Sequence, residues 1–263
     1  MKKKYKLLLN TKFTKKISSL AIYSPAVAEI VDGNVDIILV GDSLGTTLYG
    51  MRNTQSVSLS MMKAHGKAVI KNVKKSFTMI DMPYNTYKNK NQALRNAQDL
   101  LRYTKAKMIK LEINEKKLEI VKHLSKNNIN VVAHLGVTPQ DYKDFSKIKI
   151  KGKNQNEINI LKNLAVNCEI NGAKAILLEC ITEKAAKKIT STVSIPSIGI
   201  GASKNCDGQI LVFDDLINLK IGKKKPKFVK KFLDFEKLLK NAVKKFAQEV
   251  REKKFPSKKY SYH

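Results

Sequence analysis

Short runs of branched apolar residues recur along the chain, and each ends abruptly at an ionisable side chain. The clearest run extends from Ile37 to Val40 and is followed by Gly41 and Asp42. An unbroken apolar run of this length is typical of a strand that is covered on both faces, as in a parallel sheet. Four further runs end in the same way, at Asp81, at Lys110 and Glu112, at His134, and at Glu179. The pattern therefore predicts parallel strands that each deliver a polar group at their carboxyl end.

Segments with helical periodicity alternate with these runs. Further strands are predicted over 17–23, 194–200 and 208–213, and helices over 25–31, 58–73, 91–105, 116–126, 157–170 and 183–190. Eight strands alternating with helices, in units of about thirty residues, are typical of a (β/α)8 TIM barrel. We expect one barrel domain over residues 1–263, with a Lys-rich helical extension from Pro226 onward. The alternative is an open doubly wound sheet, but no Gly-x-Gly-x-x-Gly motif follows the first strand, which disfavours a dinucleotide-binding version.

Parallel strands of such a fold bring their carboxyl ends to one mouth, so the five strand-end groups are expected to share a site. The connection from Leu135 to Asn154 is unusually long for a compact domain, and a long loop is more often functional than idle. We therefore expect this loop to belong to the mouth as well.

The formal net charge is +29, with 51 Lys and Arg against 22 Asp and Glu. Such an excess first suggests a nucleic acid or another anionic surface. However, only four of the cations are arginine, so the planar fork that binds phosphates and guanines is nearly absent. We interpret the lysines as solvated helix faces that attract small acids, such as a 2-oxo acid or a polyglutamate tail, and we expect no specific nucleic-acid partner.

The three cysteines, Cys168, Cys180 and Cys206, show no paired spacing, so neither disulfides nor a zinc site are predicted. The charged start of the chain imitates a signal peptide, but its apolar run of three leucines is too short, and no later run is long enough for a membrane span. A cytoplasmic protein without a membrane partner is the expectation.

Each mouth residue taken alone has a structural explanation: Asp42 as a cap, His134 as a core histidine, and Glu112 as a partner of Lys110. Several carboxylates in one cleft repel one another, however, and a hard divalent cation relieves that repulsion. Two carboxylates, waters and an oxygen-rich substrate are the usual ligands of Mg²⁺. Asp42 and Asp81 are the first candidate ligands, and Glu112 is expected to bind directly or through water.

A metal of this kind can hold a 2-oxo acid and stabilise the enolate that forms when the neighbouring carbon loses a proton. Glu179, with its apolar neighbours Ile176 to Leu178, is the candidate base. Lys110 offers a rival route through a Schiff base, but a lysine beside carboxylates stays protonated, so we interpret it as an electrostatic partner of the substrate.

Seven ordered motifs resemble the ketopantoate hydroxymethyltransferase family nearly end to end. They are VGDSLG from Val40, Asp81-Met82-Pro83, Lys110-Leu111-Glu112, HLGVTPQ from His134, Leu178-Glu179-Cys180, IPSIGIGA from Ile195, and DGQILV from Asp207. The resemblance implies a barrel of the phosphoenolpyruvate/pyruvate type, Mg²⁺, and 5,10-methylenetetrahydrofolate as hydroxymethyl donor to 3-methyl-2-oxobutanoate. It also implies a cytoplasmic role in pantothenate biosynthesis and a homo-oligomer, usually a decamer.

Carried over to this chain, the resemblance assigns metal ligation to Asp42, Asp81 and Glu112 and proton abstraction to Glu179. It assigns contacts with the oxo acid to Ser43, Asp81, Lys110 and His134. Departures from the family pattern fall on the side that would receive the folate, at Tyr23, Ile113, Asn114, Lys151, Lys153, Ser203 and Phe213. Two alternatives remain: another metal-dependent aldolase or lyase of the same barrel type, and a non-catalytic Lys-rich binding protein.

Overall fold

The computed structural model describes residues 15–219 and 226–262. It divides into two compact units, Met1–Val212 and Phe213–His263. The charged start of the chain lies outside the described residues. Within those residues, no helix is long and apolar enough to cross a membrane.

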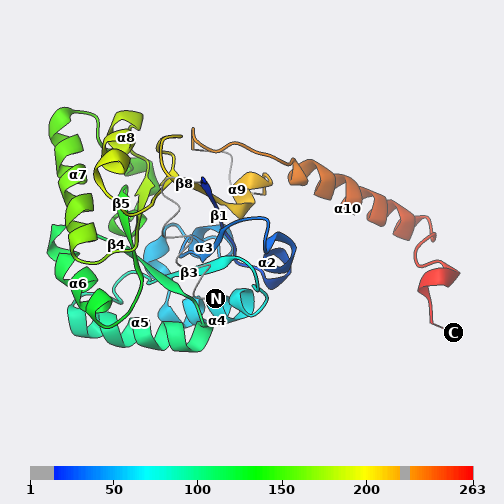
Figure 1. Ribbon diagram of the computed structural model, residues 1–263. Coiled ribbons are helices and arrows are strands. Elements are labelled where there is room, and N and C mark those ends of the chain that lie inside the picture. Colours follow the sequence, from blue (N-terminus) through cyan, green and yellow to red (C-terminus); the bar gives the residue numbers. More distant parts are fainter. Residues whose placement is uncertain (1–14, 220–225, 263) are drawn as a thin grey trace. The chain divides into compact units, whose positions relative to one another are not determined.

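The first unit is a closed barrel of eight parallel strands in sequential order (Figure 1). This confirms the predicted TIM barrel and excludes the open sheet. The strands are β1 (Ile17–Ala21), β2 (Ile37–Val40), β3 (Phe77–Asp81), β4 (Met108–Glu112), β5 (Val131–Gly136), β6 (Ala175–Glu179), β7 (Ser197–Ile200) and β8 (Gly208–Val212). The barrel closes because β8 pairs with β1, from Ile17 opposite Gly208 to Ala21 opposite Val212.

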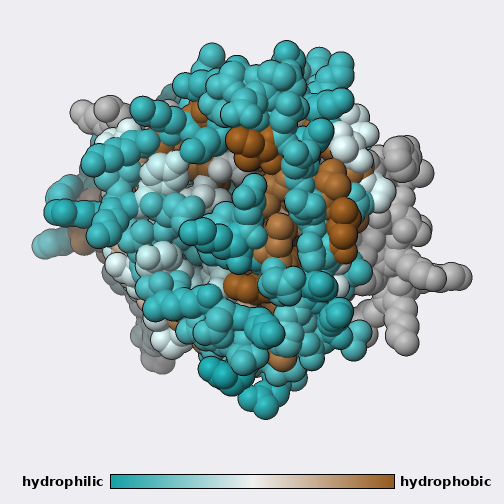
Figure 2. All heavy atoms as spheres, turned by 90° about the vertical axis from the view of Figure 1, so that its left-hand side faces the viewer, coloured by the Kyte–Doolittle hydropathy of each residue, from teal (hydrophilic) through white to brown (hydrophobic). Residues whose placement is uncertain are grey.

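Helices follow every strand of the barrel except β7 and cover the barrel from outside (Figure 1). In this unit they are α2 (Pro25–Val31), α3 (Leu44–Thr47), α4 (Leu59–Ile70), α5 (Lys90–Thr104), α6 (Leu118–Lys126), α7 (Gln155–Ile170) and α8 (Glu183–Thr192). Several begin at a polar side chain that accepts a backbone N–H, as Ser58 does from Met61 and Asn154 from Glu157. Figure 2 shows the face that carries α6 and α7, which is mostly hydrophilic with scattered apolar patches.

Most predicted boundaries agree with the structure to within three residues. The first strand ends at Ala21 rather than at residue 23, and β7 begins at Ser197 rather than at residue 194. The segment 43–57, which we expected to be a polar loop, contains α3 and the 3-10 turn η2 (Thr54–Ser56). The long connection after β5 contains two further 3-10 turns, η4 (Pro139–Asp141) and η5 (Phe145–Lys147).

The second unit begins at Phe213, directly after the end of β8. It contains α9 (Phe213–Leu216), α10 (Phe235–Arg251) and the turn η6 (Lys258–Tyr260). The backbone N–H of Phe235 donates to the carbonyl of Ile217, and the Asn218 amide donates to Asp234 at 2.9 Å. These bonds tie the end of α9 to the start of α10, whose residues are all at least partly exposed.

Candidate active site

The strand register brings the predicted ionisable groups to one end of the barrel. Asp81 lies opposite Lys110, Glu112 opposite His134, and Gly136 opposite Glu179. Side chains two residues apart on a strand point to the same face, so Lys110 and Glu112 are directed alike. The structure thus places the sequence-predicted residues of β3, β4, β5 and β6 in one cluster.

Within this cluster, four side chains form a continuous row across adjacent strands. The Lys110 ammonium lies 3.1 Å from Asp81 Oδ1 and 3.3 Å from His134 Nδ1. On its other side, His134 Nε2 lies 3.1 Å from Glu179 Oε2. Asp81, Lys110 and His134 are buried, whereas the Glu179 side chain is 21% exposed. Glu179 therefore faces an imidazole and solvent, rather than the apolar setting expected from its neighbours in sequence.

Asp42 and Glu112 lie beside this row and are also buried. The backbone N–H of Asp42 donates to Asp81 Oδ2 at 3.0 Å, which fixes the turn after β2 against the end of β3. Glu112 Oε1 lies 3.7 Å from His134 Nδ1. Ser43 follows Asp42 directly, and its hydroxyl lies 2.6 Å from the hydroxyl of Tyr23.

Gln140 connects these carboxylates, and the sequence reasoning did not assign it to the site. Its side-chain amide donates to Asp42 Oδ2 at 2.7 Å and to the carbonyl of Met82 at 3.0 Å. Its backbone N–H donates to Glu112 Oε2 at 3.0 Å, and its amide oxygen accepts from the hydroxyl of Tyr87. Two signals pointed to it: the unusual length of the loop that contains Gln140, and its place at the end of the HLGVTPQ motif.

The electrostatics reflect the burial of several carboxylates around one ammonium group. Desolvation raises the pKa of Asp81 to about 7. The attraction of Lys110 opposes this shift, and the nearby charge of Asp42 adds to it. Desolvation and the charge of Asp42 also raise the pKa of Glu112 well above its usual value. Although burial opposes it, the carboxylates around Lys110, first of all Asp81, raise the pKa of that amine, so it is a cation and not a free nucleophile.

The donor set fits a hard divalent cation. Four carboxylates, those of Asp42, Asp81, Glu112 and Glu179, act on the charge of Lys110, so positive charge is deficient in this cluster. Asp81 Oδ1 is buried and has no aligned hydrogen-bond donor. The Lys110 ammonium lies 3.1 Å away and contacts it as an ion pair. Among the described residues, no three acidic, histidine or cysteine side chains converge closely enough to hold one ion together. Ligation that includes water, which Mg²⁺ usually retains, agrees with both observations.

Comparison with known proteins identifies the family. Residues 2–258 match the ketopantoate hydroxymethyltransferase family. The 3-methyl-2-oxobutanoate hydroxymethyltransferase of Pelagibacter ubique is 46% identical over 262 residues, which are 100% of both chains. The enzyme of the same name from Helicobacter pylori is 41% identical over 248 residues, which are 94% of this chain and 92% of the relative.

Solved structures with low sequence identity share the fold. A phosphonopyruvate hydrolase has a TM-score of 0.65 at 11% identity, covering 99% of this chain and 90% of its own. A structure of phosphonopyruvate hydrolase in complex with oxalate and Mg²⁺ has a TM-score of 0.62 at 13% identity, covering 98% of this chain and 92% of its own. The barrel therefore has the architecture of these enzymes, and the full-length match in sequence shows that the chain belongs to the ketopantoate hydroxymethyltransferase family.

Proposed function

We propose that the protein transfers a hydroxymethyl group from 5,10-methylenetetrahydrofolate to 3-methyl-2-oxobutanoate, giving 2-dehydropantoate for pantothenate biosynthesis. Membership of the family supports the reaction class. The observation that carries the assignment of residues is the row from Asp81 through Lys110 and His134 to Glu179. It combines a cation, an imidazole and a partly exposed carboxylate at one mouth, which is what the removal of a proton beside a carbonyl requires.

In this reaction Glu179 takes the proton from C3 of the oxo acid, and the electron pair of that C–H bond moves into the enolate. The ammonium of Lys110 stabilises the negative charge that grows on the keto oxygen. C3 then forms a bond to the one-carbon unit, and the two bonds from that carbon to the folate nitrogens break. Water supplies the hydroxyl group, and its second proton and the proton held by Glu179 go to the two nitrogens as tetrahydrofolate leaves. Ser43 and Asp81 orient the substrate carboxylate and keto group.

Asp42 and Asp81 are the proposed ligands of Mg²⁺, and Glu112 would act on the ion through water. When bound, the ion supplies Lewis-acid stabilisation of the keto oxygen and offsets the repulsion between the buried carboxylates. Gln140 holds Asp42 and Glu112 in place through its hydrogen bonds to both.

The cytoplasm is the proposed location, since three unpaired thiols suit a reducing compartment. A homo-oligomer, a decamer by family resemblance, is the proposed assembly, and sedimentation of the purified protein tests it. A monomer would refute this assembly and leave the reaction unaffected.

The decisive experiment separates proton removal from one-carbon transfer. With 3-methyl-2-oxobutanoate and Mg²⁺ alone in D₂O, we expect enzyme-dependent exchange of the C3 proton, followed by NMR. Glu179→Gln should lower the exchange rate by ~10²-fold or more while retaining binding of the oxo acid. If the oxo acid and Mg²⁺ bind but no exchange occurs, the proposal is wrong. Exchange without product formation in the presence of the folate would favour another 2-oxo acid aldolase or lyase.

A further inference from the structure

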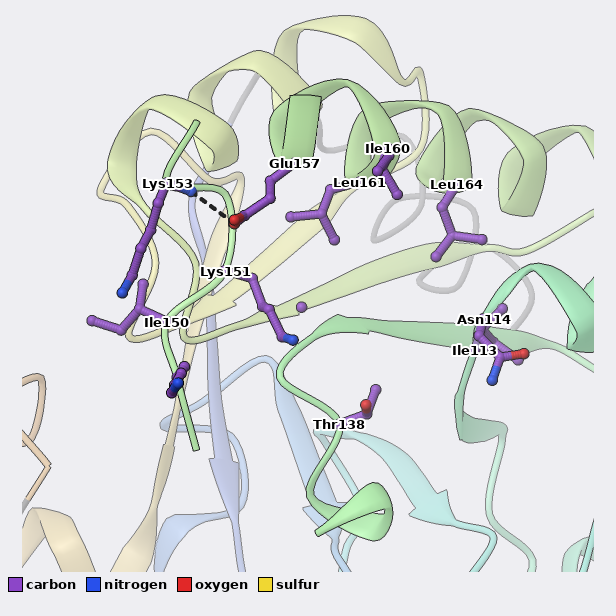
Figure 3. Close-up of a pocket in the computed structure, with 12 residues that line it drawn as sticks. Ile113, Asn114, Thr138, Ile150, Lys151, Lys153, Glu157, Ile160, Leu161 and Leu164 are labelled. Atoms are coloured by element: carbon purple, nitrogen blue, oxygen red, sulfur yellow. Dashed lines mark hydrogen bonds between the residues drawn. The ribbon is translucent and has the colours of Figure 1, made fainter. Parts of the chain in front are cut away.

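A cavity of about 470 Å³ lies between helix α7 and the segments that follow β4 and β5 (Figure 3). This volume lies within the range of small-molecule sites. The residues that carry the argument are Ile113, Lys149, Ile150, Lys151, Lys153 and Ile160. None of these residues has a role in the chemical steps proposed above, and Ile113, Lys151 and Lys153 are among the departures from the family pattern.

The cavity adjoins the candidate active site through the backbone. Ile113 and Asn114, which line it, follow Glu112 directly, and the N–H of Ile113 donates to the carbonyl of His134 at 3.1 Å. Gly136, which also lines it, has a φ of +95° and lies so close to Glu179 that an added Cβ would be 2.3 Å from the Glu179 carbonyl oxygen. The wall of the cavity is therefore continuous in the backbone with the strand ends that carry Glu112 and Glu179.

The loop that carries the lysines is held in place by several hydrogen bonds. The N–H of Lys151 donates to the carbonyl of Cys180 at 3.0 Å, and the carbonyl of Lys151 accepts from the N–H of Thr182 at 2.9 Å. The Glu157 carboxylate accepts from the N–H groups of Gly152 at 2.8 Å and Lys153 at 3.0 Å. A loop fixed in this way presents its side chains without a large ordering cost on binding.

The polar part of the cavity is cationic. Three lysines line it, against one acid, Glu157, whose carboxylate is already bonded to the loop backbone. In the part of the chain that the structure describes, no carboxylate lies within 4.0 Å of the ammonium groups of Lys149, Lys151 or Lys153. In Figure 3, the side chain of Lys151 points from the loop into the space beside Thr138 and Asn114. These charges suit a ligand with more than one carboxylate.

The remaining wall is apolar. Leu161 and Leu164 of α7 line the cavity together with Ile113. At its edge, Ile150 and Ile160 are 54% and 48% exposed, so a considerable apolar surface lies next to the lysines. An elongated ligand with a flat apolar body and a polyanionic end would match a cavity with one apolar wall and one cationic part.

We propose that the cavity binds the p-aminobenzoyl-glutamate part of the folate co-substrate, and that Lys149, Lys151 and Lys153 recognise the carboxylates of an oligo-γ-glutamate tail. This inference rests on the proposed function, because it requires a folate at the mouth. The aromatic ring packs against Ile150 and Ile160, and each further glutamate adds a carboxylate within reach of the cationic loop. The protein should accordingly distinguish folates by the length of their tails.

Equilibrium binding of p-aminobenzoyl-γ-glutamates without the pterin tests the cavity alone. We expect the triglutamate to bind at least tenfold more tightly than the monoglutamate, with a difference that shrinks as salt is added. Lys151→Gln and Lys153→Gln should each weaken triglutamate binding up to about fivefold, the upper range for partly exposed ion pairs, with little effect on the monoglutamate. Lys151→Arg, which keeps the charge, should retain most of the affinity.

Lys126→Gln is the matched control, because Lys126 ends α6 just before β5 and so lies at the opposite end of the barrel. It should change neither binding nor turnover, and melting temperatures verify that every variant is folded. The inference would be refuted if the monoglutamate and the triglutamate bound with equal affinity. It would also be refuted if Lys151→Gln weakened the binding of both ligands equally. Exchange of the C3 proton by the unmodified protein, which needs no folate, tests the proposed function separately.

Discussion

His134 presents one ring nitrogen to Glu179, with Nε2 lying 3.1 Å from a carboxylate oxygen. Its other nitrogen, Nδ1, lies 3.3 Å from the ammonium of Lys110, which can only donate. Nδ1 must therefore accept, and the proton of the neutral ring resides on Nε2, which lies close to Glu179 but is not aligned for a hydrogen bond. Burial and the charge of Lys110 lower the pKa of His134, so the ring is neutral at physiological pH.

This arrangement predicts that His134 positions the base through the contact of Nε2 with the Glu179 carboxylate. His134→Phe removes the N–H donor, so C3 exchange in D₂O should fall about tenfold to a hundredfold, the scale for loss of an orienting partner. His134→Gln, which can still donate, should recover part of the rate. A His134→Gln variant that exchanges C3 no faster than His134→Phe would show that His134 only fills space.

A second prediction distinguishes metal-dependent chemistry from a Schiff base at Lys110. EDTA should abolish C3 exchange and Mg²⁺ should restore it, because the buried carboxylates need a cation. Asp42→Ala and Asp81→Ala should each remove the binding of Mg²⁺ and oxo acid together, as followed by calorimetry. Borohydride with substrate should leave Lys110 unmodified, since its raised pKa keeps it protonated. Labelling of Lys110, with activity indifferent to EDTA, would reverse the assignment.

The carboxylate of Asp81 predicts a dependence of stability on pH. Its pKa is raised in the folded state, chiefly by desolvation, from 3.8 to about 7. The folded protein therefore binds more protons than the unfolded chain between these values, and the contribution of Asp81 to stability falls as pH rises through this window. In the absence of metal, the melting temperature of the unmodified protein should fall as pH rises through this window, and Asp81→Asn should reduce that fall. Since Mg²⁺ binds the ionised form, its stabilising effect should grow from pH 5 to pH 8 and vanish in Asp81→Asn.

Much of this site could be predicted from the sequence, because position on a parallel strand is a local property. Burial on both faces marks the strands, and the first polar residue after each apolar run marks its carboxyl end, so Asp42, Asp81 and Glu179 could be identified. What the strands cannot reveal is how loops fold back over the mouth. Gln140 contacts Asp42 from 98 positions away, and only the path of the loop after β5 brings them together. The pairing of Tyr23 with Ser43 depends in the same way on the turns after β1 and β2.

Gln140 gives the last prediction, because several buried groups depend on its side chain. Gln140→Ala leaves the carbonyl of Met82, one oxygen of Asp42 and the hydroxyl of Tyr87 without their bonds to its amide. Each buried group left unsatisfied costs about 1–3 kcal/mol, so we expect a loss of at least about 2 kcal/mol in the free energy of unfolding, measured with urea. Mg²⁺ affinity should fall as well, because Asp42 is no longer held. Gln55→Ala is the control: it removes only the 2.8 Å bond to the Gln140 carbonyl, in a part-buried position, and should cost less than half as much. Comparable losses in both variants would mean that Gln140 supports the loop rather than the carboxylates.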